Sequence, residues 1–404
     1  MAQTFHLCFK VEKNLFPPYT FFMANDIFNG AKNLGFGLMR LPTKNPDDAG
    51  DIDIELVKKM VDRFIEQGFT YFDTALMYCG SQSEAATKKF LVDRYPRDKF
   101  TLTTKLHSGF INSEEDCDKV FNGQLERTGA GYFDYYLVHD INIHSIEVYN
   151  RLKVFDWIKQ KKEQGLVKHI GFSFHDSPEL LDKVLSEHPE MEFVQIQLNY
   201  FDYENPGVRS RECYEVCLKY NKPIIVMEPV KGGTLVNMGS EIEDMYKKYN
   251  PSASVASWAI RFAASHKNVA MVLSGMSNME QLEDNTSYMK NFVALNEEEN
   301  ALIKKAVEIL NKSKAVPCTG CSYCTEGCPI HIAIPKYFAL LNADLKQDPN
   351  GTAGWTVQLE YYDNLAKNFG KASECIKCGQ CEEICPQHLN VTRYLEDVAA
   401  RFEK

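Results

Sequence analysis

Eight of the thirteen cysteines lie near the C-terminus, in two runs of identical spacing, C-x2-C-x2-C-x3-C-P. Three cysteines at intervals of three can surround one 4Fe-4S cluster within a tight loop, whereas a fourth, next to a proline, turns away and can ligate a second cluster. The pattern therefore predicts two 4Fe-4S clusters. One would be held by Cys318, Cys321, Cys324 and Cys385, and the other by Cys375, Cys378, Cys381 and Cys328.

Structural zinc is the alternative for these cysteines, but zinc sites use two separated C-x2-C pairs, and a third cysteine at the same interval adds nothing. Because 46 residues of expected helix separate the two runs, the region resembles helical dicluster ferredoxin modules. Four thiolates around an oxidised cluster leave a net charge of about −2. An electron-transfer protein that docks there would therefore present a basic patch.

Four polar residues in the first half of the chain have side chains suited to reducing a carbonyl group: Asp73, Tyr78, Lys105 and His139. Tyr78 can donate a proton to the carbonyl oxygen while hydride reaches the carbon. An unperturbed tyrosine titrates near pH ~10, so a nearby ammonium such as Lys105 would stabilise the phenolate. Asp73 would keep that lysine charged, and His139 can hydrogen-bond the carbonyl oxygen. The structural alternative is that Asp73 and Lys105 form an ion pair, that His139 is a buried histidine whose hydrogen bonds are made within the protein, and that Tyr78 packs in the core.

Eight apolar runs are expected to form the strands that position these side chains. They are nearly continuous in Val, Ile, Leu, Phe and Tyr, as is typical of parallel strands covered on both faces. The runs are 34–40, 71–75, 100–106, 132–140, 169–175, 193–200, 223–229 and 269–275. Asp73 lies in the second run and Tyr78 just after it. Lys105 lies in the third run, and His139 lies at the end of the fourth.

Amphipathic helices are expected between the strands. In the first, Leu56, Met60 and Phe64 form an apolar stripe at i, i+4 spacing. Others are expected over 147–164, 178–187, 207–220 and 252–266. Eight strand–helix units in about 260 residues predict an α/β fold, a (β/α)8 TIM barrel, whose active site lies at the C-terminal ends of the strands. A doubly wound open sheet is the alternative, but no G-x-G-x-x-G follows the first strand.

The composition changes at Val316-Pro317, after a polar helix expected over 297–315. We therefore expect a barrel domain over 23–313 and a small helical dicluster domain over 314–404, with helices at 334–347, 354–369 and 390–404. Residues 1–22 are interpreted as an extension without an assigned role, because Met23 opens a segment that resembles a natural beginning.

Composition and charge exclude several classes of protein. A formal net charge of −10 argues against a broad nucleic-acid surface. No apolar run approaches the ~18–20 residues that a membrane helix needs, and no secretory signal is visible. We expect a cytoplasmic protein, in which clustered cysteines bind metal more often than they form disulfides.

The barrel segments resemble those of the aldo-keto reductases, in particular the branch fused to a C-terminal ferredoxin domain. The similar segments include 35–42, 72–84, 103–106, 135–140, 171–175, 194–200 and 274–285. The resemblance implies that Asp73, Tyr78, Lys105 and His139 are the catalytic residues, that NADPH or NADH is the cofactor, and that the substrate is a small carbonyl compound. It also implies cofactor contacts, from Ser173 and Gln195 to the carboxamide and from Ser274, Gln281 and Asn285 to the adenosine end.

The chain departs from the family pattern at three cofactor contacts. Phe174 replaces the usual Asn after Ser173, and Met227 replaces the aromatic residue that commonly stacks on the nicotinamide. No basic residue stands within 275–278 to grip the 2′-phosphate of NADP, for which arginine is the usual residue. Lys231 is a substitute phosphate contact or, alternatively, a solvated loop lysine.

Three functions remain open from the sequence. The first, which we favour, is an NAD(P)H-dependent carbonyl reductase whose clusters serve docking, regulation or structure. The second is an oxidoreductase in which cluster electrons reach a flavin or the substrate in the barrel, although no motif indicates a flavin. The third is a non-catalytic redox-sensing protein.

Overall fold

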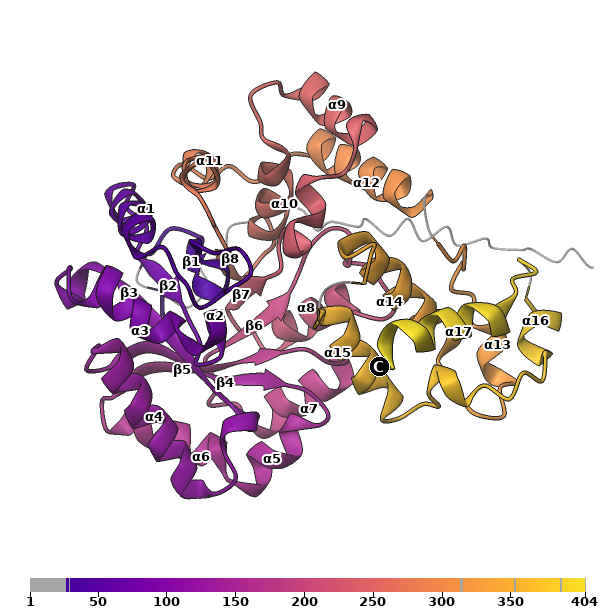
Figure 1. Cartoon of the computed structure of the whole chain (residues 1–404), viewed down its shortest axis with the longest axis horizontal. Coiled ribbons are helices and arrows are strands. Elements are labelled where there is room, and N and C mark those ends of the chain that lie inside the picture. Colours follow the sequence, from indigo (N-terminus) through magenta and orange to yellow (C-terminus); the bar gives the residue numbers. More distant parts are fainter. Residues whose placement is uncertain (1–26, 29, 313–314, 352–353, 386, 404) are drawn as a thin grey trace, which may run out of the picture.

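The computed structural model describes residues 27–28, 30–312, 315–351, 354–385 and 387–403. The extension expected over 1–22, the start of the barrel domain at Met23 and the second cluster proline, Pro386, lie outside these residues. Figure 1 shows a barrel surrounded by helices and, beside it, a smaller helical region formed by the C-terminal part of the chain.

Eight parallel strands close into a barrel in sequence order, with β1 pairing both β2 and β8. They are β1 (Leu34–Gly37), β2 (Tyr71–Asp73), β3 (Thr101–His107), β4 (Phe133–Ile141), β5 (Val167–Phe174), β6 (Phe193–Gln197), β7 (Ile224–Met227) and β8 (Val269–Ser274). Each overlaps one of the eight expected runs, so the predicted TIM barrel is confirmed and the open sheet is excluded.

The barrel domain contains several helices, most of which cover the outside of the barrel. They are α1 (Ile54–Glu66), α2 (Tyr78–Ser81), α3 (Ser83–Thr87), α4 (Glu114–Thr128), α5 (Ser145–Arg151), α6 (Val154–Glu163), α7 (Pro178–Glu187), α8 (Ser210–Lys219), α9 (Ser240–Tyr249), α10 (Val255–Ala264), α11 (Met279–Met289) and α12 (Glu297–Lys312). The single helix expected over 147–164 is wrong. The structure has α5 and α6 there, because Lys153 between them has a left-handed backbone, φ 49°, that no α-helix can continue.

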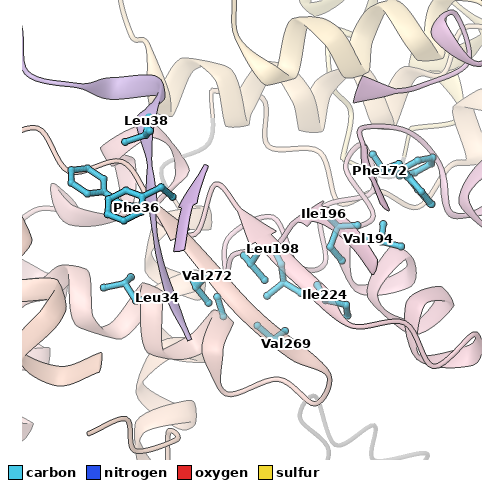
Figure 2. Close-up of a cluster of buried hydrophobic side chains, with 14 of the residues drawn as sticks. Leu34, Phe36, Leu38, Phe172, Val194, Ile196, Leu198, Ile224, Val269 and Val272 are labelled. Carbon is cyan, nitrogen blue, oxygen red and sulfur yellow. The ribbon is translucent and has the colours of Figure 1, made fainter. Parts of the chain in front are cut away.

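Side chains along the strands alternate between the inside of the barrel and its helix-covered outside. On the outside, Leu34 and Val194 belong to one buried cluster with helix residues such as Phe64; Figure 2 shows several of its strand residues. On the inside, Tyr71 and Tyr135 belong to a second buried cluster. Both residues lie towards the N-terminal ends of their strands. Interior residues further along the same strands therefore reach the C-terminal mouth of the barrel.

The C-terminal region has its own hydrophobic core, to which Tyr337, Tyr362 and Leu395 contribute. Its helices are α13 (Tyr323–Glu326), α14 (Ile334–Gln347), α15 (Val357–Ala366), α16 (Gln380–Glu383) and α17 (Val391–Phe402). In Figure 1, α14 and α15 lie on the side of the barrel, whereas α13 and α16 lie at the far end. Within the described part of the chain, no helix combines the length and apolar character needed to cross a membrane.

Candidate active site and cluster sites

The structure brings the four residues of the expected catalytic site together at the mouth of the barrel. Asp73 ends β2 two positions after the interior Tyr71, Lys105 lies in β3, and His139 lies near the end of β4. The Nζ atom of Lys105 lies 2.5 Å from Asp73 Oδ1 and 3.3 Å from the Tyr78 hydroxyl. The rings of Tyr78 and His139 meet edge-on, with centroids 6.2 Å apart.

Burial and mutual contacts set the charges of these groups. Burial disfavours the ammonium of Lys105, yet the nearby Asp73 and Tyr78 raise its pKa above the ordinary value. Burial raises the pKa of Tyr78, and Lys105 opposes that shift. Burial, together with the positive charge of Lys105, lowers the pKa of His139 well below its ordinary value. At neutral pH the site therefore holds a charged lysine, a protonated phenol and a neutral imidazole.

A cavity of about 940 Å³ opens over this group. Most of the predicted site residues line it, namely Asp73, Tyr78, His139, Ser173, Gln195, Ser274, Gln281 and Asn285. Gln195 Oε1 and His139 Nδ1 are buried there and have no hydrogen-bond partner among the described residues. Such orphaned polar atoms are costly unless a bound group satisfies them. A cofactor carboxamide and a substrate carbonyl have the hydrogen-bonding groups that these atoms lack.

The far end of the cavity shows how the expected adenosine contacts are held. Asn285 Nδ2 donates to Ser274 Oγ at 2.8 Å, and Gln281 Oε1 accepts from the backbone N–H of Ser277 at 2.7 Å. Met227 lines the cavity beside Gln195, whose Nε2 lies 3.7 Å from Met227 Sδ. The cavity is thus long enough to connect the polar groups at the barrel mouth with the start of α11.

Arg40 is a cavity residue that the sequence reasoning missed. It ends a short 3-10 turn after β1 (Leu38–Arg40), and its backbone oxygen accepts a hydrogen bond from Ser277 Oγ at 2.8 Å. Its side chain lies over Gly275, where an added Cβ would be 3.4 Å from Arg40 Cβ. The family pattern indicates a phosphate contact only within 275–278, but the barrel closes β1 against β8 and brings Arg40 to the same place.

The expectation that Lys231 contacts a cofactor phosphate needs correction. Its Nζ atom lies 2.8 Å and 3.0 Å from the two carboxylate oxygens of Asp202, and both side chains are fully buried. Val230 and Gly232 line the cavity on either side, but Lys231 does not. A buried ammonium needs a counter-ion, and Asp202 supplies it, so Lys231 is neither a phosphate contact nor a solvated loop lysine.

Asp140 also lines the cavity, although it directly follows His139. Consecutive residues of a regular strand face opposite sides. Here the pairing of β4 with β5 shifts between Val138 and Ile141, and Asp140 has a left-handed backbone, φ 55°. A bulge of this kind re-aims one side chain. Its geometry is held by the Asp140 N–H, which donates to Ser173 Oγ at 2.7 Å.

The eight cysteines of the C-terminal region line two small cavities. Cys318, Cys321, Cys324 and Cys385 line one, and Cys328, Cys375, Cys378 and Cys381 line the other. This is the crossed grouping that the spacing predicts, with each fourth cysteine supplied by the opposite run. Backbone N–H groups of Gly320 and Ile332 each donate to a cysteine sulfur at 3.4 Å, a contact that tunes cluster potential in iron–sulfur proteins. The thiolate donor sets therefore fit two four-iron clusters.

Comparison with known proteins agrees with this architecture. A model of the aldo/keto reductase family matches residues 33–308, and a model of the 4Fe-4S dicluster domain matches residues 317–389. L-galactose dehydrogenase from Arabidopsis thaliana is 24% identical over 258 residues, which cover 58% of this chain and 78% of that protein.

Two solved structures show the barrel fold. An aldo-keto reductase from Klebsiella pneumoniae, in complex with NADP and acetate, matches with a TM-score of 0.55 and 15% identity, over 68% of this chain and 91% of that chain. The holo form of an aldo-keto reductase from Bacillus halodurans matches with a TM-score of 0.52 and 22% identity, over the same shares. Since the family model spans most of the chain, this protein belongs to the aldo/keto reductase family of oxidoreductases and carries a 4Fe-4S dicluster domain behind its barrel.

Proposed function

We propose that the barrel reduces an aldehyde or ketone to an alcohol with NAD(P)H, and that Tyr78 is the proton donor. The observation that carries this proposal is the contact of Lys105 with both Tyr78 and Asp73 at the floor of the cavity. A bound nicotinamide would supply the hydride. The Tyr78 hydroxyl would protonate the carbonyl oxygen, and the ammonium of Lys105 would stabilise the phenolate that remains.

The other residues position and polarise the substrate. His139 is neutral, so one of its ring nitrogens carries a proton and can donate it to the carbonyl oxygen as a hydrogen bond. Asp73 holds the ammonium of Lys105 in place. Ser173 and Gln195 would hold the carboxamide of the cofactor, and the groups at α11 would hold its adenosine end.

Arg40 favours NADPH over NADH in this arrangement. Its side chain is exposed and lines the cavity that Ser274 and Gln281 also line, with the guanidinium beside Gly232, where an added Cβ would lie 3.6 Å from Arg40 Nη2. Guanidinium groups bind phosphate through paired hydrogen bonds, so Arg40 would grip the 2′-phosphate that distinguishes the two cofactors. The complex of the Klebsiella pneumoniae enzyme with NADP is consistent with this preference.

We also propose that the eight cysteines hold two 4Fe-4S clusters, in the crossed grouping of the two cavities. Cys318 additionally lines a cavity of about 260 Å³ between the barrel and the C-terminal region, together with the aromatic residues Phe201 and Tyr203. One cluster site thus borders the barrel. This contact supports cluster-linked electron transfer as the second candidate function.

The test uses protein purified anaerobically with its clusters loaded. NADPH and a panel of aldehydes are added, and the loss of nicotinamide absorbance is followed together with alcohol formation. One alcohol formed per NADPH consumed would support the proposed function. Alcohol formed only when the clusters are chemically reduced, without consumption of NADPH, would instead favour cluster-linked electron transfer, and additional bands in the absorbance spectrum would reveal a flavin.

A further inference from the structure

The end of the C-terminal region that lies away from the barrel exposes three large apolar side chains. Tyr323, Ile376 and Ile384 have exposed fractions of 58%, 60% and 55%. Tyr323 begins α13 and Ile384 directly follows α16, two short helices that contact each other and lie at this end in Figure 1. Exposed apolar side chains that gather at one part of a surface mark a site of interaction, whereas single ones need no explanation. We call the surface around these three residues the cluster face.

Two residues of the cluster face flank the first cysteine cavity. Cys324 directly follows Tyr323, and Cys385 directly follows Ile384. Both cysteines line the same small cavity, although they come from different cysteine runs. A cluster bound there would therefore have an exposed aromatic ring and an exposed aliphatic side chain beside two of its ligands.

The third residue, Ile376, borders the second cysteine cavity, which it lines together with Cys378. Cys378 is exposed, and so is Cys321 in the first cavity. Because the rate of electron transfer falls steeply with distance, a protein that exchanges electrons with the clusters must dock where little polypeptide covers them. The two exposed thiols show that the cluster face is such a place.

The charge of the cluster face is negative. Residues 318–330 and 375–385 contain three glutamates and a single lysine or arginine, Lys377. The Nζ atom of Lys377 lies 2.6 Å from Glu396 Oε1, so a carboxylate already balances this cation. Each oxidised cluster in the two cavities would add a net charge of about −2. A protein with basic side chains would therefore be attracted to this face, and one with acidic side chains would be repelled.

We propose that the cluster face is the docking site of a one-electron carrier protein whose redox group is surrounded by basic side chains. This inference rests on the two proposed clusters and does not depend on carbonyl reduction in the barrel. In the exchange an oxidised carrier gains one electron and a reduced cluster loses one, without transfer of a proton or change of a bond. Three apolar side chains with charged residues around them suit the small interfaces, below about 1,200 Å², of such transient complexes.

The first cysteine cavity connects this face with the barrel. Cys318 lines that cavity and also the larger cavity that Phe201 and Tyr203 of the barrel domain line. Cys324 lines the first cavity too, next to the exposed Tyr323. An electron accepted at the cluster face would therefore reach a cluster that borders the barrel domain, which gives the docking site a place in cluster-linked electron transfer.

The test uses the anaerobically purified holoenzyme, reduced with dithionite and freed of excess reductant. Cytochrome c serves as a basic one-electron carrier and plastocyanin as an acidic one. Their absorbance changes give the second-order rate constants of electron transfer, and calorimetry on the oxidised proteins gives affinities without any electron transfer. At low ionic strength we expect cytochrome c to react at least about 10-fold faster than plastocyanin, and we expect its rate constant and affinity to fall as salt is added.

Two variants remove apolar contacts from the cluster face without changing its charge. Ile376→Ser and Ile384→Ser should each lower the rate constant and the affinity for cytochrome c by about 10-fold, because one buried apolar anchor of a small interface is lost. Val293→Ser is the matched control, since Val293 is an apolar residue of the barrel domain that is 69% exposed. Iron is measured in every variant, so that loss of a cluster is not mistaken for loss of docking.

A third variant gives a gain that a misfolded protein cannot imitate. Glu383→Lys should slow electron transfer to cytochrome c and speed electron transfer to plastocyanin. Glu126→Lys, at an exposed glutamate of α4, makes the same change of charge elsewhere and should leave the ratio of the two rate constants nearly unchanged.

Three results would overturn the docking site. The first is a wild type that reacts faster with plastocyanin, and the second is a pair of isoleucine variants that keep full iron and wild-type rate constants. The third is a dimer in sedimentation that Ile384→Ser dissociates, because the face would then bind a second copy of this chain. A wild type without iron would remove the clusters and the docking site together, and would leave the proposed carbonyl reduction in the barrel standing.

Discussion

The ammonium of Lys105 lies 3.3 Å from the hydroxyl group of Tyr78. The lysine side chain is fully buried, and its charge is balanced by Asp73 at 2.5 Å. A phenol that must give up a proton in a largely apolar cavity needs a positive charge beside it, and the charge needs a counter-ion because it is buried. The three residues therefore work as one unit, which can be tested by removing its members one at a time.

Replacing Lys105 by methionine should lower kcat for carbonyl reduction by about 10²–10⁴-fold, the usual contribution of acid–base catalysis. The substitution also leaves Asp73 buried without its partner, which should cost about 3–5 kcal/mol of the free energy of unfolding. Steady-state kinetics and denaturant titration measure the two effects. A variant with normal turnover would show that Tyr78 does not depend on Lys105.

The double variant Asp73→Asn/Lys105→Met separates stability from catalysis. It removes both charges, so most of the lost unfolding free energy should return, while kcat should stay low. If kcat recovered together with stability, the effect of Lys105→Met alone would be structural.

The rate of carbonyl reduction should be level from about pH 6 to about pH 10 and fall only above that range. Reduction needs Tyr78 protonated, and burial raises the pKa of Tyr78 above its ordinary value of 10.0. His139 should not titrate in this range, because burial and Lys105 lower its pKa well below 6.5. The dependence of kcat on pH, in the direction of reduction, provides the measurement. An inflection near pH 6.5 that disappears in a His139→Gln variant would contradict the neutral imidazole.

Arg40→Gln should raise KM for NADPH by about 10-fold and leave KM for NADH nearly unchanged. The guanidinium is expected to pair with the 2′-phosphate, and a hydrogen bond to a charged group contributes about 1.5–3 kcal/mol. The two cofactors serve as controls for each other within one variant. Equal changes for both cofactors would show that Arg40 contributes to the shape of the site and not to phosphate recognition.

Cys378→Ser should lower the iron content from about eight to about four atoms per chain, because one of the two proposed four-iron clusters would lose a ligand. Cys217→Ser is the matched control, since Cys217 is fully buried in α8 and lies in neither cysteine cavity. Iron and acid-labile sulfide are measured after anaerobic purification. Unchanged iron in Cys378→Ser would contradict the assignment of Cys378 as a cluster ligand.

The features that could be predicted from the sequence are those with a local pattern. The apolar runs predict the eight strands, and the places of Asp73 and His139 at strand ends predict that they converge, because all parallel strands of a barrel end at one mouth. The cysteine spacing likewise predicts which three thiols of each run share a cavity, since the loop geometry of each run is encoded within a few residues. The proline beside the fourth cysteine indicates that this thiol joins the other run.

Contacts between distant segments could not be predicted in this way. Nothing near Asp140 indicates a left-handed backbone, which Asp adopts far less readily than Gly, and nothing near Glu360 indicates that α15 lies over the end of β4, where Asn142 Nδ2 donates to Glu360 Oε1 at 3.3 Å. The role of Lys231 is also decided by a contact with a distant segment. Its place in the loop after the seventh strand is compatible with a phosphate contact, but Asp202, from the loop after the sixth strand, pairs with its ammonium group.

The most direct test of the carbonyl-reducing site is kcat of the Tyr78→Phe variant with NADPH and a reducible aldehyde. We expect a fall of about 10²–10⁴-fold, while iron content, unfolding midpoint and affinity for NADPH stay at wild-type values, because only the hydroxyl group is lost. Turnover close to that of the wild type would show that Tyr78 is not the proton donor and that the barrel does not act through this group of residues.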